Sequence, residues 1–387
     1  MGSERKILAV TGIRSDYDIM SEVFREIRRT KGLALEVVAT GAHLSPAFGY
    51  TVNDIIADGN NVVDKIESLI SGDKEESRLK SLSVQLIGLM QSILKSQPDI
   101  LLVLGDREEA INTAICGSYL NIPIAHIGGG DRVIGNVDDQ VRHAVTKLSH
   151  VHFVTNNESE KRVLALGEQN FRVKNFGNPG LDRFVNTPVM NMSEVSDEVG
   201  LELKEKAYIM LIQHVISTEV SQAFFQMSTT LAALAEINMP VLISYPNSDA
   251  GGYKIIQAIE EYKDNKKFKT FKNIPRHLFI NLLRNAGVLV GNSSCGIMEA
   301  PLIKLPVVNV GNRQFARLHA NNVQFVEHDK LKIQRAVKTA LFDDSYKHFL
   351  RTSCENPYGN GQTSKKIAQF LLDIKIDNKL LIKDITY

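Results

Sequence analysis

The most constraining feature of this sequence is a regular alternation of short, almost wholly apolar runs with longer amphipathic segments. In the first half, apolar runs rich in β-branched residues occur at 7–10, 35–38, 100–104 and 151–154. Helix-length segments lie between them, at 18–29, 76–95 and 108–120. Strands that are apolar along their whole length are typical of a parallel sheet covered by helices on both faces. The pattern therefore predicts an α/β fold.

The same pattern stops and then begins again in the second half of the chain. Asn178-Pro179-Gly180 and a polar stretch at 186–205 interrupt it, and apolar runs return at 208–212, 241–244, 288–290 and 307–310. The chain of 387 residues is too long for one ordinary core. We therefore expect two Rossmann-like, doubly wound α/β domains, at 1–178 and 179–362, with a central cleft between them. Residues 363–387 are expected to form a C-terminal helix and tail, whose docking the sequence leaves open.

Composition excludes several classes of function. The 45 Lys and Arg residues nearly balance the 44 Asp and Glu residues, so the formal net charge is +1 and no nucleic-acid partner is expected. No apolar run approaches the roughly 18–20 residues of a membrane span. The first residues lead directly into a strand without a signal-peptide core, which predicts a cytoplasmic protein. The spacings of cysteine and histidine suggest neither a disulfide framework nor a metal site.

One strand-to-helix turn in the second half has the composition of a phosphate site. The run at 288–290 leads into Gly291-Asn292-Ser293-Ser294-Cys295-Gly296, where backbone N–H groups and serine hydroxyls can bind a diphosphate. An ordinary serine cap of a helix would look similar. Glu299, about two turns into the expected helix, can accept hydrogen bonds from ribose hydroxyls or simply face solvent. Arg313, after a later strand, and Arg14, after the first strand, can each contact an anion.

Carboxylates follow three elements in the first half. Asp106 comes after the strand at 100–104, Asp131 after the next strand, and Asp138 at the start of a helix that also carries Arg142. Asp138 and Arg142 are four residues apart and share a helix face. An isolated Asp at such a position is usually a helix cap. Several on one edge of a sheet favour acid–base chemistry.

Two histidines also end strands. His43 ends the second strand of the first domain, and His214 ends the first strand of the second domain. A histidine at a strand end is often a structural residue, but two near one cleft suit proton transfer at neutral pH. The turn at 11–17 lacks the G-x-G-x-x-G pattern, so it does not resemble a dinucleotide site, and we expect no cofactor. Cys295 is expected to be a small buried residue.

Taken in order, these motifs resemble a known family. Together with Gln213-His214 and Pro246-Asn247-x-Asp249-Ala250-Gly251, they are similar to the hydrolysing UDP-N-acetylglucosamine 2-epimerases of sialic-acid and legionaminic-acid pathways. The similarity extends from Arg14 to about Gly361. It implies the architecture of the B-type glycosyltransferases (GT-B), with UDP held mainly by the second domain, and a homodimer or tetramer. It also implies a UDP-sugar substrate, anti-elimination of UDP across carbons 1 and 2, and addition of water.

The resemblance also suggests roles for individual residues. Asp106, Asp131 and Asp138 match the acid–base set, and Arg142 and His214 are expected close to the diphosphate or the sugar. The residues expected to bind substrate, from motifs and strand ends together, are Arg14, His43, Asn247, Ser293, Ser294, Glu299 and Arg313. One departure is Gly128, where many relatives carry a glutamate treated as catalytic; a glycine cannot transfer a proton.

Several alternatives remain open at this point. The sugar is either UDP-N-acetylglucosamine or UDP-2,4-diacetamido-2,4,6-trideoxyglucose. The reaction is either hydrolysing or, in a second interpretation, a reversible non-hydrolysing epimerisation. Gly128 motivates a third hypothesis, a regulator that binds a UDP-sugar with impaired catalysis. A glycosyltransferase is compatible with the fold alone.

Overall fold

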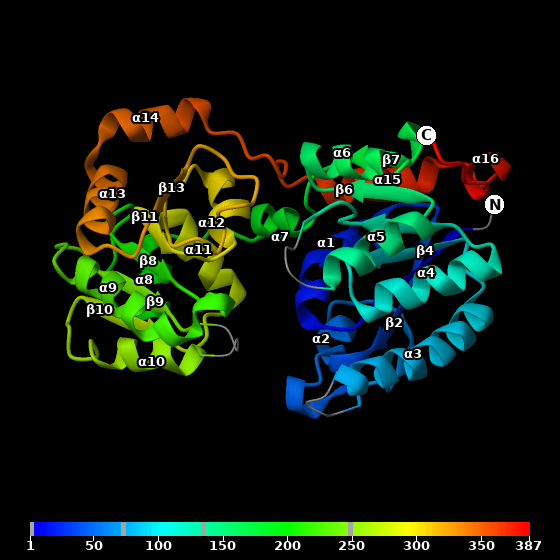
Figure 1. The fold of residues 1–387 in the computed structure, drawn as a ribbon, viewed down its shortest axis with the longest axis horizontal. Helices are drawn as coiled ribbons and strands as arrows, with labels where there is room; N and C mark the ends of the chain where they lie inside the picture. The colour runs from blue at the N-terminus through cyan, green and yellow to red at the C-terminus, as the bar shows by residue number, and fades with distance from the viewer. Residues whose placement is uncertain (1–3, 71–74, 133–136, 247–250) are drawn as a thin grey trace. The chain divides into compact units, whose positions relative to one another are not determined.

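The chain forms two compact units, each built on a parallel sheet (Figure 1). The computed structural model describes residues 4–70, 75–132, 137–246 and 251–387. The first unit combines Met1–Val185 with Tyr358–Tyr387, and the second is Asn186–Pro357. The two expected α/β domains are therefore present. The chain enters the second unit after residue 185 and leaves it after residue 357, whereas the sequence pattern placed these boundaries after 178 and 362.

The sheet of the first unit has seven strands in the order β3-β2-β1-β4-β5-β6-β7, and every pair is parallel. Its strands are β1 (Arg5–Thr11), β2 (Leu33–Thr40), β3 (Val62–Ile66), β4 (Ile100–Leu104), β5 (Ile124–Ile127), β6 (Val151–Val154) and β7 (Val173–Asn175). Successive residues of β1 enter different cores: Ile7 and Ala9 join one cluster, and Leu8 and Val10 join another. Both faces are thus buried, as the apolar runs predicted.

Helices cover both faces of this sheet. One cluster includes residues of α1 (Arg14–Arg29) and α15 (Thr363–Asp373), and the other includes residues of α3 (Glu75–Ser96) and α4 (Glu108–Leu120). The remaining helices are α2 (Val52–Ala57), α5 (Asp138–Leu148), α6 (Asn157–Ala165), α7 (Gly180–Asn186) and α16 (Asn378–Leu381), with short 3-10 helices at Gly41–Leu44, Pro46–Phe48 and Asn170–Arg172. None of the helices in the described part of the chain is both long and apolar enough to cross a lipid bilayer.

The second unit repeats the plan with six parallel strands in the order β10-β9-β8-β11-β12-β13. The strands are β8 (Ile209–Ile212), β9 (Val241–Ser244), β10 (Phe268–Phe271), β11 (Val288–Gly291), β12 (Val307–Val310) and β13 (Val323–Val326). The helices are α8 (Met192–Val199), α9 (Ala223–Ala235), α10 (Gly252–Glu260), α11 (Arg276–Asn285), α12 (Cys295–Met298), α13 (Lys330–Phe342) and α14 (Asp344–Ser353), with 3-10 helices at Ser217–Gln222 and Ala300–Ile303.

These strand orders place two switch points, where the order of strands reverses. The switch point lies between β1 and β4 in the first sheet, and between β8 and β11 in the second. In open parallel sheets, ligands bind beyond the carboxyl ends of the strands that flank such a point. The turns that begin at Gly12, Gly105, Gln213 and Asn292 are therefore the first places to look for a site.

The C-terminal segment, whose docking the sequence left open, packs on the first unit. The carboxylate of Asp182 accepts the backbone N–H groups of Thr363 at 3.0 Å and Ser364 at 2.5 Å, which caps the start of α15. At the other end of this helix, Arg5 donates to the carbonyl oxygens of Leu371 at 2.5 Å and Leu372 at 2.8 Å. The last part of the chain is thus a part of the first unit.

Candidate active site

An ion pair between two predicted catalytic residues marks the carboxyl edge of the first sheet. Asp106 follows β4, and its Oδ2 accepts a hydrogen bond from Nη2 of Arg142 on α5. Nη1 of Arg142 donates to the carbonyl oxygen of Gly128 at 2.8 Å. The two side chains are only 15% and 9% exposed, so little water competes for these bonds. The pair fixes a carboxylate and a guanidinium group side by side at the switch point.

The other two predicted acids lie on the same rim. Oδ1 of Asp131 accepts hydrogen bonds from the hydroxyls of Thr155 at 2.5 Å and Ser159 at 2.7 Å. A Cβ atom on Gly128 would lie 3.6 Å from Oδ2 of Asp131 and 3.5 Å from Nη1 of Arg142, so Gly128 lies between these two groups. Asp138 begins α5. The structure therefore places Asp131 near the Asp106–Arg142 pair and Asp138 at the start of the helix that carries Arg142, and the catalytic roles of the three acids stay predictions.

A second cluster at this switch point was missed by the sequence analysis. Nε of Arg107 lies 3.3 Å from Oε1 of Glu109 on α4 and 3.9 Å from Oδ2 of Asp16 in the first turn of α1. Burial, followed by the charge of Glu109, raises the pKa of Asp16 to about 7, and burial also raises the pKa of Glu109. A carboxyl group that titrates near neutral pH is suited to proton transfer.

A sequence signal for this cluster existed. The acids follow directly on motifs that were already recognised, with Asp16 two residues after Arg14 and Glu109 three residues after Asp106. What the sequence could not show is that one guanidinium group reaches across the switch point from β4 to β1. Arg14 itself is exposed at the first position of α1, a placement that leaves its predicted contact with an anion open.

His43 has a different environment from the one predicted. Its side chain is fully buried, with Nε2 3.0 Å from the hydroxyl of Thr11 and Nδ1 2.7 Å from the hydroxyl of Thr51. Burial lowers the pKa of His43 to about 4, so the ring is neutral. This geometry is typical of a structural histidine that joins β1 to the segment after β2, and it argues against the predicted contact with substrate.

In the second unit, Asn292 connects the two turns of the switch point. Its Oδ1 accepts the backbone N–H of His214 at 2.7 Å, and its Nδ2 donates to the carbonyl oxygen of His214 at 2.9 Å. The carbonyl oxygen of Asn292 in turn accepts from Arg313 at 3.2 Å and from Gln314 at 3.0 Å. Three segments that end β8, β11 and β12 are thus joined around one asparagine. The structure brings His214 and Arg313 together at this edge of the sheet.

The small-residue turn is confirmed, but the helix after it is shorter than expected. α12 covers only Cys295–Met298, and Glu299 follows its last residue rather than lying two turns inside a helix. Ser293 and Ser294 are partly exposed, and the hydroxyl of Ser293 accepts from the thiol of Cys295 at 3.1 Å. Cys295 is buried, as predicted, and burial raises the pKa of its thiol to about 12. This cysteine therefore stays protonated.

Glu299 carries the clearest sign of a missing hydrogen-bond donor. Its Oε1 lies 3.6 Å from Nη2 of Arg276, at the start of α11, while its Oε2 is buried without a hydrogen-bond partner in the described part of the chain. Burial also raises the pKa of Glu299. Leaving a buried acceptor unsatisfied is costly, so such an atom needs a donor from elsewhere. Arg276 was not among the predicted site residues.

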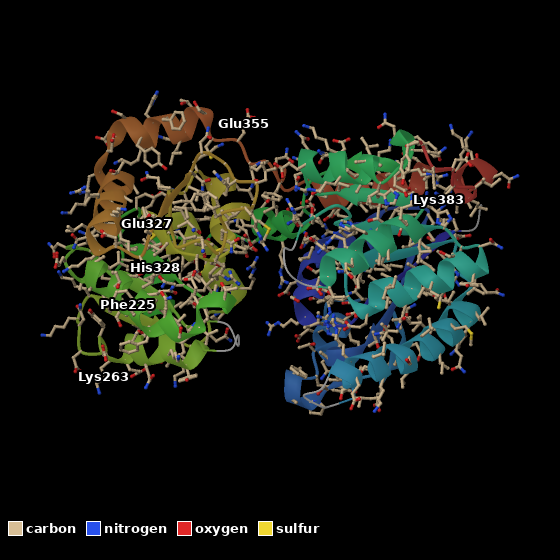
Figure 2. The ribbon with its side chains drawn as sticks, in the orientation of Figure 1. Phe225, Lys263, Glu327, His328, Glu355 and Lys383 are labelled. Carbon is tan, nitrogen blue, oxygen red and sulfur yellow. The ribbon has the colours of Figure 1, made fainter. Side chains whose placement is uncertain are left out.

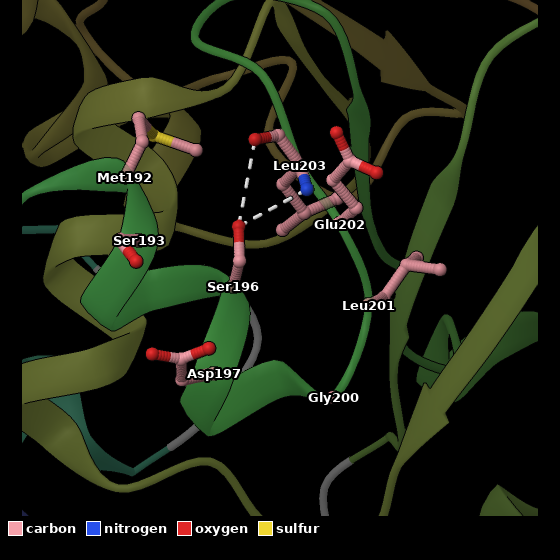
Figure 3. A pocket seen from close by; sticks show the side chains of 8 residues that line it. All are labelled: Met192, Ser193, Ser196, Asp197, Gly200, Leu201, Glu202 and Leu203. Carbon is pink, nitrogen blue, oxygen red and sulfur yellow. Dashed lines mark hydrogen bonds between the residues drawn. The ribbon is translucent and has the colours of Figure 1, made fainter.

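Three further observations concern Asn247, a pocket and metal binding. Asn247, predicted to bind substrate, lies outside the described residues. A pocket of about 520 Å³ is lined by eight residues of α8 and the loop after it, none of them a predicted site residue: Met192, Ser193, Ser196, Asp197, Gly200, Leu201, Glu202 and Leu203. There Ser196 bonds the backbone of Leu203 (Figure 3). Within the described ranges, no group of three His, Cys, Asp or Glu side chains is placed to hold a metal ion.

Comparison with known proteins decides the family. The model of the UDP-N-acetylglucosamine 2-epimerase family matches residues 25–372. The chain belongs to this family. The resemblance seen in the motifs is thereby confirmed, and the protein is an enzyme of the 2-epimerase type.

Two curated relatives of this epimerase family member are similar along most of the chain. The UDP-N,N'-diacetylbacillosamine 2-epimerase (hydrolyzing) of Legionella pneumophila is 35% identical over 379 residues, covering 98% of each chain. The GDP/UDP-N,N'-diacetylbacillosamine 2-epimerase (hydrolyzing) of Campylobacter jejuni is 32% identical over 324 residues, covering 83% of this chain and 84% of the relative.

Solved structures confirm the fold. The UDP-GlcNAc 2-epimerase of Neisseria meningitidis bound to UDP-GlcNAc superposes with a TM-score of 0.77 at 19% identity, over 95% of this chain and all of the other. The epimerase of Methanocaldococcus jannaschii gives 0.74 at 18% identity, over 95% and 99%. The predicted pair of Rossmann-like domains of the GT-B type is therefore the correct fold class.

Proposed function

We propose that the protein converts UDP-N,N'-diacetylbacillosamine, the 2,4-diacetamido-2,4,6-trideoxyglucose derivative, into UDP and the free 2-epimeric, manno-configured sugar. The observation that carries this proposal is the similarity, at 35% identity over 98% of both chains, to a hydrolysing 2-epimerase named for that substrate. A second hydrolysing relative, at 32% identity, is named for the same sugar. Of the two sugars that the sequence left open, this favours the diacetamido sugar over UDP-N-acetylglucosamine.

The rim of the first unit supplies the acid–base part of the reaction. A carboxylate removes the proton from carbon 2, the bond between carbon 1 and the UDP oxygen breaks, and a double bond forms between carbons 1 and 2. Water then adds its oxygen to carbon 1, while carbon 2 receives a proton on the opposite face. Asp106, Asp131 and Asp138 are the groups we assign to these proton transfers. Arg142 holds Asp106 in place and offers positive charge to the departing diphosphate.

The edge of the second unit supplies the binding site for UDP. Ser293 and Ser294 are partly exposed at the turn after β11, where their hydroxyls can donate to phosphate oxygens. Oε2 of Glu299 is buried without a hydrogen-bond partner in the described part of the chain, and a ribose hydroxyl can donate to it. His214 and Arg313, which lie around Asn292, are assigned to the diphosphate, as is Arg14 of the first unit. Asn247 is assigned to the substrate by its motif.

We further propose that the enzyme acts in the cytoplasm as a homodimer or tetramer, within a pathway to a sialic-acid or legionaminic-acid sugar. The pathway is supported by a relative of Escherichia coli named polysialic acid biosynthesis protein P7, which is 29% identical over 377 residues. Light scattering on the purified protein tests the oligomeric state, and a monomer at micromolar concentration would contradict it.

The decisive experiment follows both candidate UDP-sugars by NMR in deuterated water. The proposal predicts release of UDP and of a free sugar that carries deuterium at carbon 2, with faster turnover of the diacetamido substrate. An equilibrium of two UDP-sugars without free UDP would instead show a non-hydrolysing epimerase. UDP binding without turnover of either sugar would show a regulator. An Asp106→Asn variant serves as the control, and we expect it to bind UDP but to release little.

A further inference from the structure

A buried carboxylate with three cationic or imidazole neighbours lies near the C-terminal end of α5, the helix that carries Asp138 and Arg142. The side chain of Glu168 is 1% exposed, and its oxygens lie 2.7 Å from Nζ of Lys147, 2.8 Å from Nζ of Lys383 and 3.0 Å from Nε2 of His152. Burial alone would raise the pKa of Glu168, but the hydrogen bond from His152 and the nearby charges outweigh burial and lower it to about 2. The carboxylate is therefore ionised at neutral pH.

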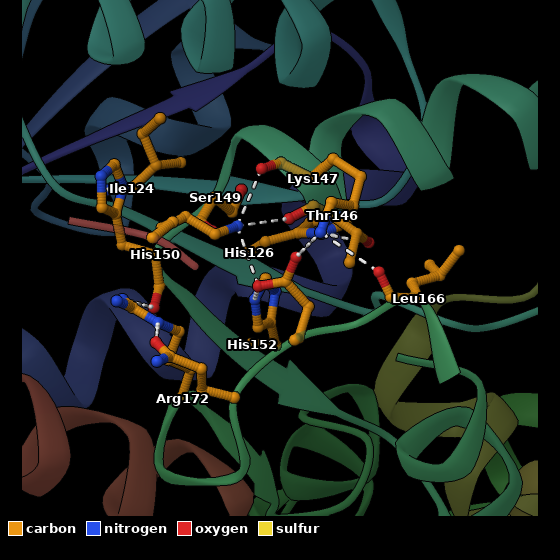
Figure 4. Close-up of polar contacts among 12 residues, drawn as sticks. Ile124, His126, Thr146, Lys147, Ser149, His150, His152, Leu166 and Arg172 are labelled. Carbon is orange, nitrogen blue, oxygen red and sulfur yellow. Dashed lines mark hydrogen bonds and ion pairs between the residues drawn. The ribbon is translucent and has the colours of Figure 1, made fainter. Parts of the chain in front are cut away.

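The neighbour that comes from farthest along the chain is Lys383, in the C-terminal tail (labelled in Figure 2). Besides the ion pair with Glu168, its ammonium group donates to the carbonyl oxygens of Ser149 at 2.5 Å, Lys147 at 2.8 Å and Thr146 at 3.4 Å. These carbonyls lie at the end of α5, where a helix runs out of its own N–H donors, although that of Thr146 also accepts the N–H of Ser149 at 3.2 Å. A lysine at this end is also favoured by the helix dipole. Lys383 thus caps α5; Thr146 and Lys147 of this helix and Ser149 after it are labelled in Figure 4.

The tail that carries Lys383 is itself fastened to the first unit. The guanidinium group of Arg172, which is 1% exposed, donates to the carbonyl oxygens of Leu380 at 2.6 Å, Ile382 at 2.7 Å and Lys379 at 2.9 Å. Farther on, the N–H of Thr386 donates to the carbonyl oxygen of Gly167 at 3.3 Å. Lys383 is therefore held from both sides, which reduces the entropy it loses when it binds α5.

The same helix is linked to the rim by a short chain of hydrogen bonds. Asp138, Arg142 and Thr146 are spaced by four residues and share one face of α5. The hydroxyl of Thr146 lies 3.4 Å from Nδ1 of His126, whose Nε2 donates to the carbonyl oxygen of Gly105 at 2.8 Å. Burial lowers the pKa of His126 to about 3, so this ring is neutral and its two nitrogens have opposite roles. Gly105 precedes Asp106, the partner of Arg142.

We propose that Lys383 is a positioning residue for the reaction, because its contacts with the last carbonyls of α5 and with Glu168 set where that helix presents Asp138 and Arg142. The proposal rests on the function proposed above. A displacement of about 1 Å in a group that takes part in chemistry can cost orders of magnitude in rate. The Asp106–Arg142 pair has a defined geometry only if α5 cannot shift along its axis, and the tail blocks that shift.

The proposal also predicts a pH dependence. Lys383 faces Glu168, Lys147, Arg172, His150 and His152; burial lowers the pKa of its ammonium group to about 8, although Glu168 partly offsets burial. Above that pH the group loses its proton and the ion pair with Glu168. Because this pKa lies below the 10.5 of a free lysine, the docked tail binds fewer protons than an undocked tail between these two values, so we expect α5 to be held more firmly, and not less, as the pH rises from about 8 to 10.5.

The test uses the full-length protein and three variants: Lys383→Met, Lys383→Arg, and Lys375→Met as a matched control. Lys375 is an exposed lysine of the same C-terminal segment. For Lys383→Met we expect kcat to fall about tenfold, while the affinity for UDP, which we assign mainly to the second unit, changes much less. Lys383→Arg should restore most of kcat, because a guanidinium group carries the same positive charge and can also donate to carbonyl oxygens. Lys375→Met should behave as wild type.

Hydrogen exchange of peptides from 138–148 gives a readout that does not depend on turnover. We expect faster exchange in Lys383→Met than in Lys375→Met. Exchange at the wild-type rate would overturn the proposal, whatever the kinetics. So would wild-type kcat in Lys383→Met, or a loss of kcat that Lys383→Arg does not restore. If the wild-type protein turns over neither UDP-sugar, the proposed function fails, and the exchange experiment still decides whether Lys383 holds α5.

Discussion

Replacing Gly291 with alanine adds one methyl group at the end of β11. We expect this change to damage the proposed UDP site more than a methyl group added at any other strand end. Gly291 is the last residue of β11, pairs with Ile212 of β8, and has φ of +121°. A Cβ atom there would lie 2.1 Å from the carbonyl oxygen of Ile212 and 2.6 Å from its carbonyl carbon. Ordinary contact begins at 3.4 Å, so the two strands must separate at the switch point. The turn that holds Asn292 would move with them.

The magnitude follows from two separate costs. A residue with a side chain pays about 1–3 kcal/mol for this backbone conformation. Forcing an extra carbon into a packed site costs about 1–3 kcal/mol more. We expect Gly291→Ala to destabilise the second unit by about 2–6 kcal/mol in total. Gly105→Ala is the matched control: Gly105 also follows a strand with a positive φ, of +74°, but no atom lies within 4 Å of its Cβ position. Only the backbone cost, about 1–2 kcal/mol, applies there.

Hydrogen exchange in urea measures both variants, because peptides report each unit separately and the chain has no tryptophan for fluorescence. Titration calorimetry with UDP measures the site. We expect Gly291→Ala to lose UDP affinity, and Gly105→Ala to keep it. If both variants destabilise their own unit equally, or if Gly291→Ala binds UDP as tightly as wild type, the crowding at Ile212 does not control this turn.

Three further predictions concern charged groups. Burial raises the pKa of Asp16 from 3.8 to about 7, so ionising this carboxyl group costs the folded protein more free energy as the pH rises between these values. Asp16→Asn removes that cost. In urea unfolding we expect it to stabilise the first unit by about 2 kcal/mol at pH 8 and by little at pH 4. The pKa of Glu168 is lowered from 4.5 to about 2, so the stabilisation that its carboxylate gives the fold is present above pH 4.5 and is lost as the pH falls through 2. Glu168→Gln should therefore lower the free energy of unfolding by about 3 kcal/mol at pH 7. Glu158→Gln, in an exposed ion pair, should lower it by about 0.5 kcal/mol or less. Gly128→Glu places a carboxylate beside Arg142 at a position with φ of +78°; we expect a changed kcat on the diacetamido substrate, and an unchanged one would mean that another carboxylate already has that role.

The central strands were predictable from the sequence, and the edge strands were not. The apolar runs at 7–10, 100–104 and 288–290 lie in β1, β4 and β11, which are buried on both faces. β3, β7, β10 and β13 lie at or next to the edges of their sheets and contain polar residues such as Asp64, Lys174 and Gln324. A strand covered on one side needs no continuous apolar run, so short mixed segments of this kind resemble loops.

Sequence motifs likewise predicted only part of the candidate site. Motifs identified Asp106, Asp131 and Arg142, because the topology of a parallel sheet brings strand ends to one edge whatever lies between them. They could not identify Lys383, whose partners are carbonyl oxygens more than 230 residues earlier in the chain. Every residue has a carbonyl group, so no residue type in the sequence indicates such a contact. The burial of His43 was likewise invisible, since the hydroxyls around it come from Thr11 and Thr51.

The balance of charge over the whole chain conceals an imbalance at the rim of the first unit. Ion pairs connect the carboxylates there to a smaller number of guanidinium groups: the acids are Asp16, Asp106, Glu108, Glu109 and Asp138, and the bases are Arg78, Arg107 and Arg142. Five carboxylates around three fixed cations in a half-buried cluster cannot all be ionised without cost. The proton stays where burial is greatest, and the pKa values of Asp16 and Glu109 are the ones raised. An elimination that takes a proton from carbon 2 needs an ionised carboxylate, whereas a hydration that returns a proton to the same carbon needs a protonated acid. The net charge of +1 therefore says little about this rim, where burial leaves a proton on carboxyl groups close to the acids that we assign to the proposed reaction.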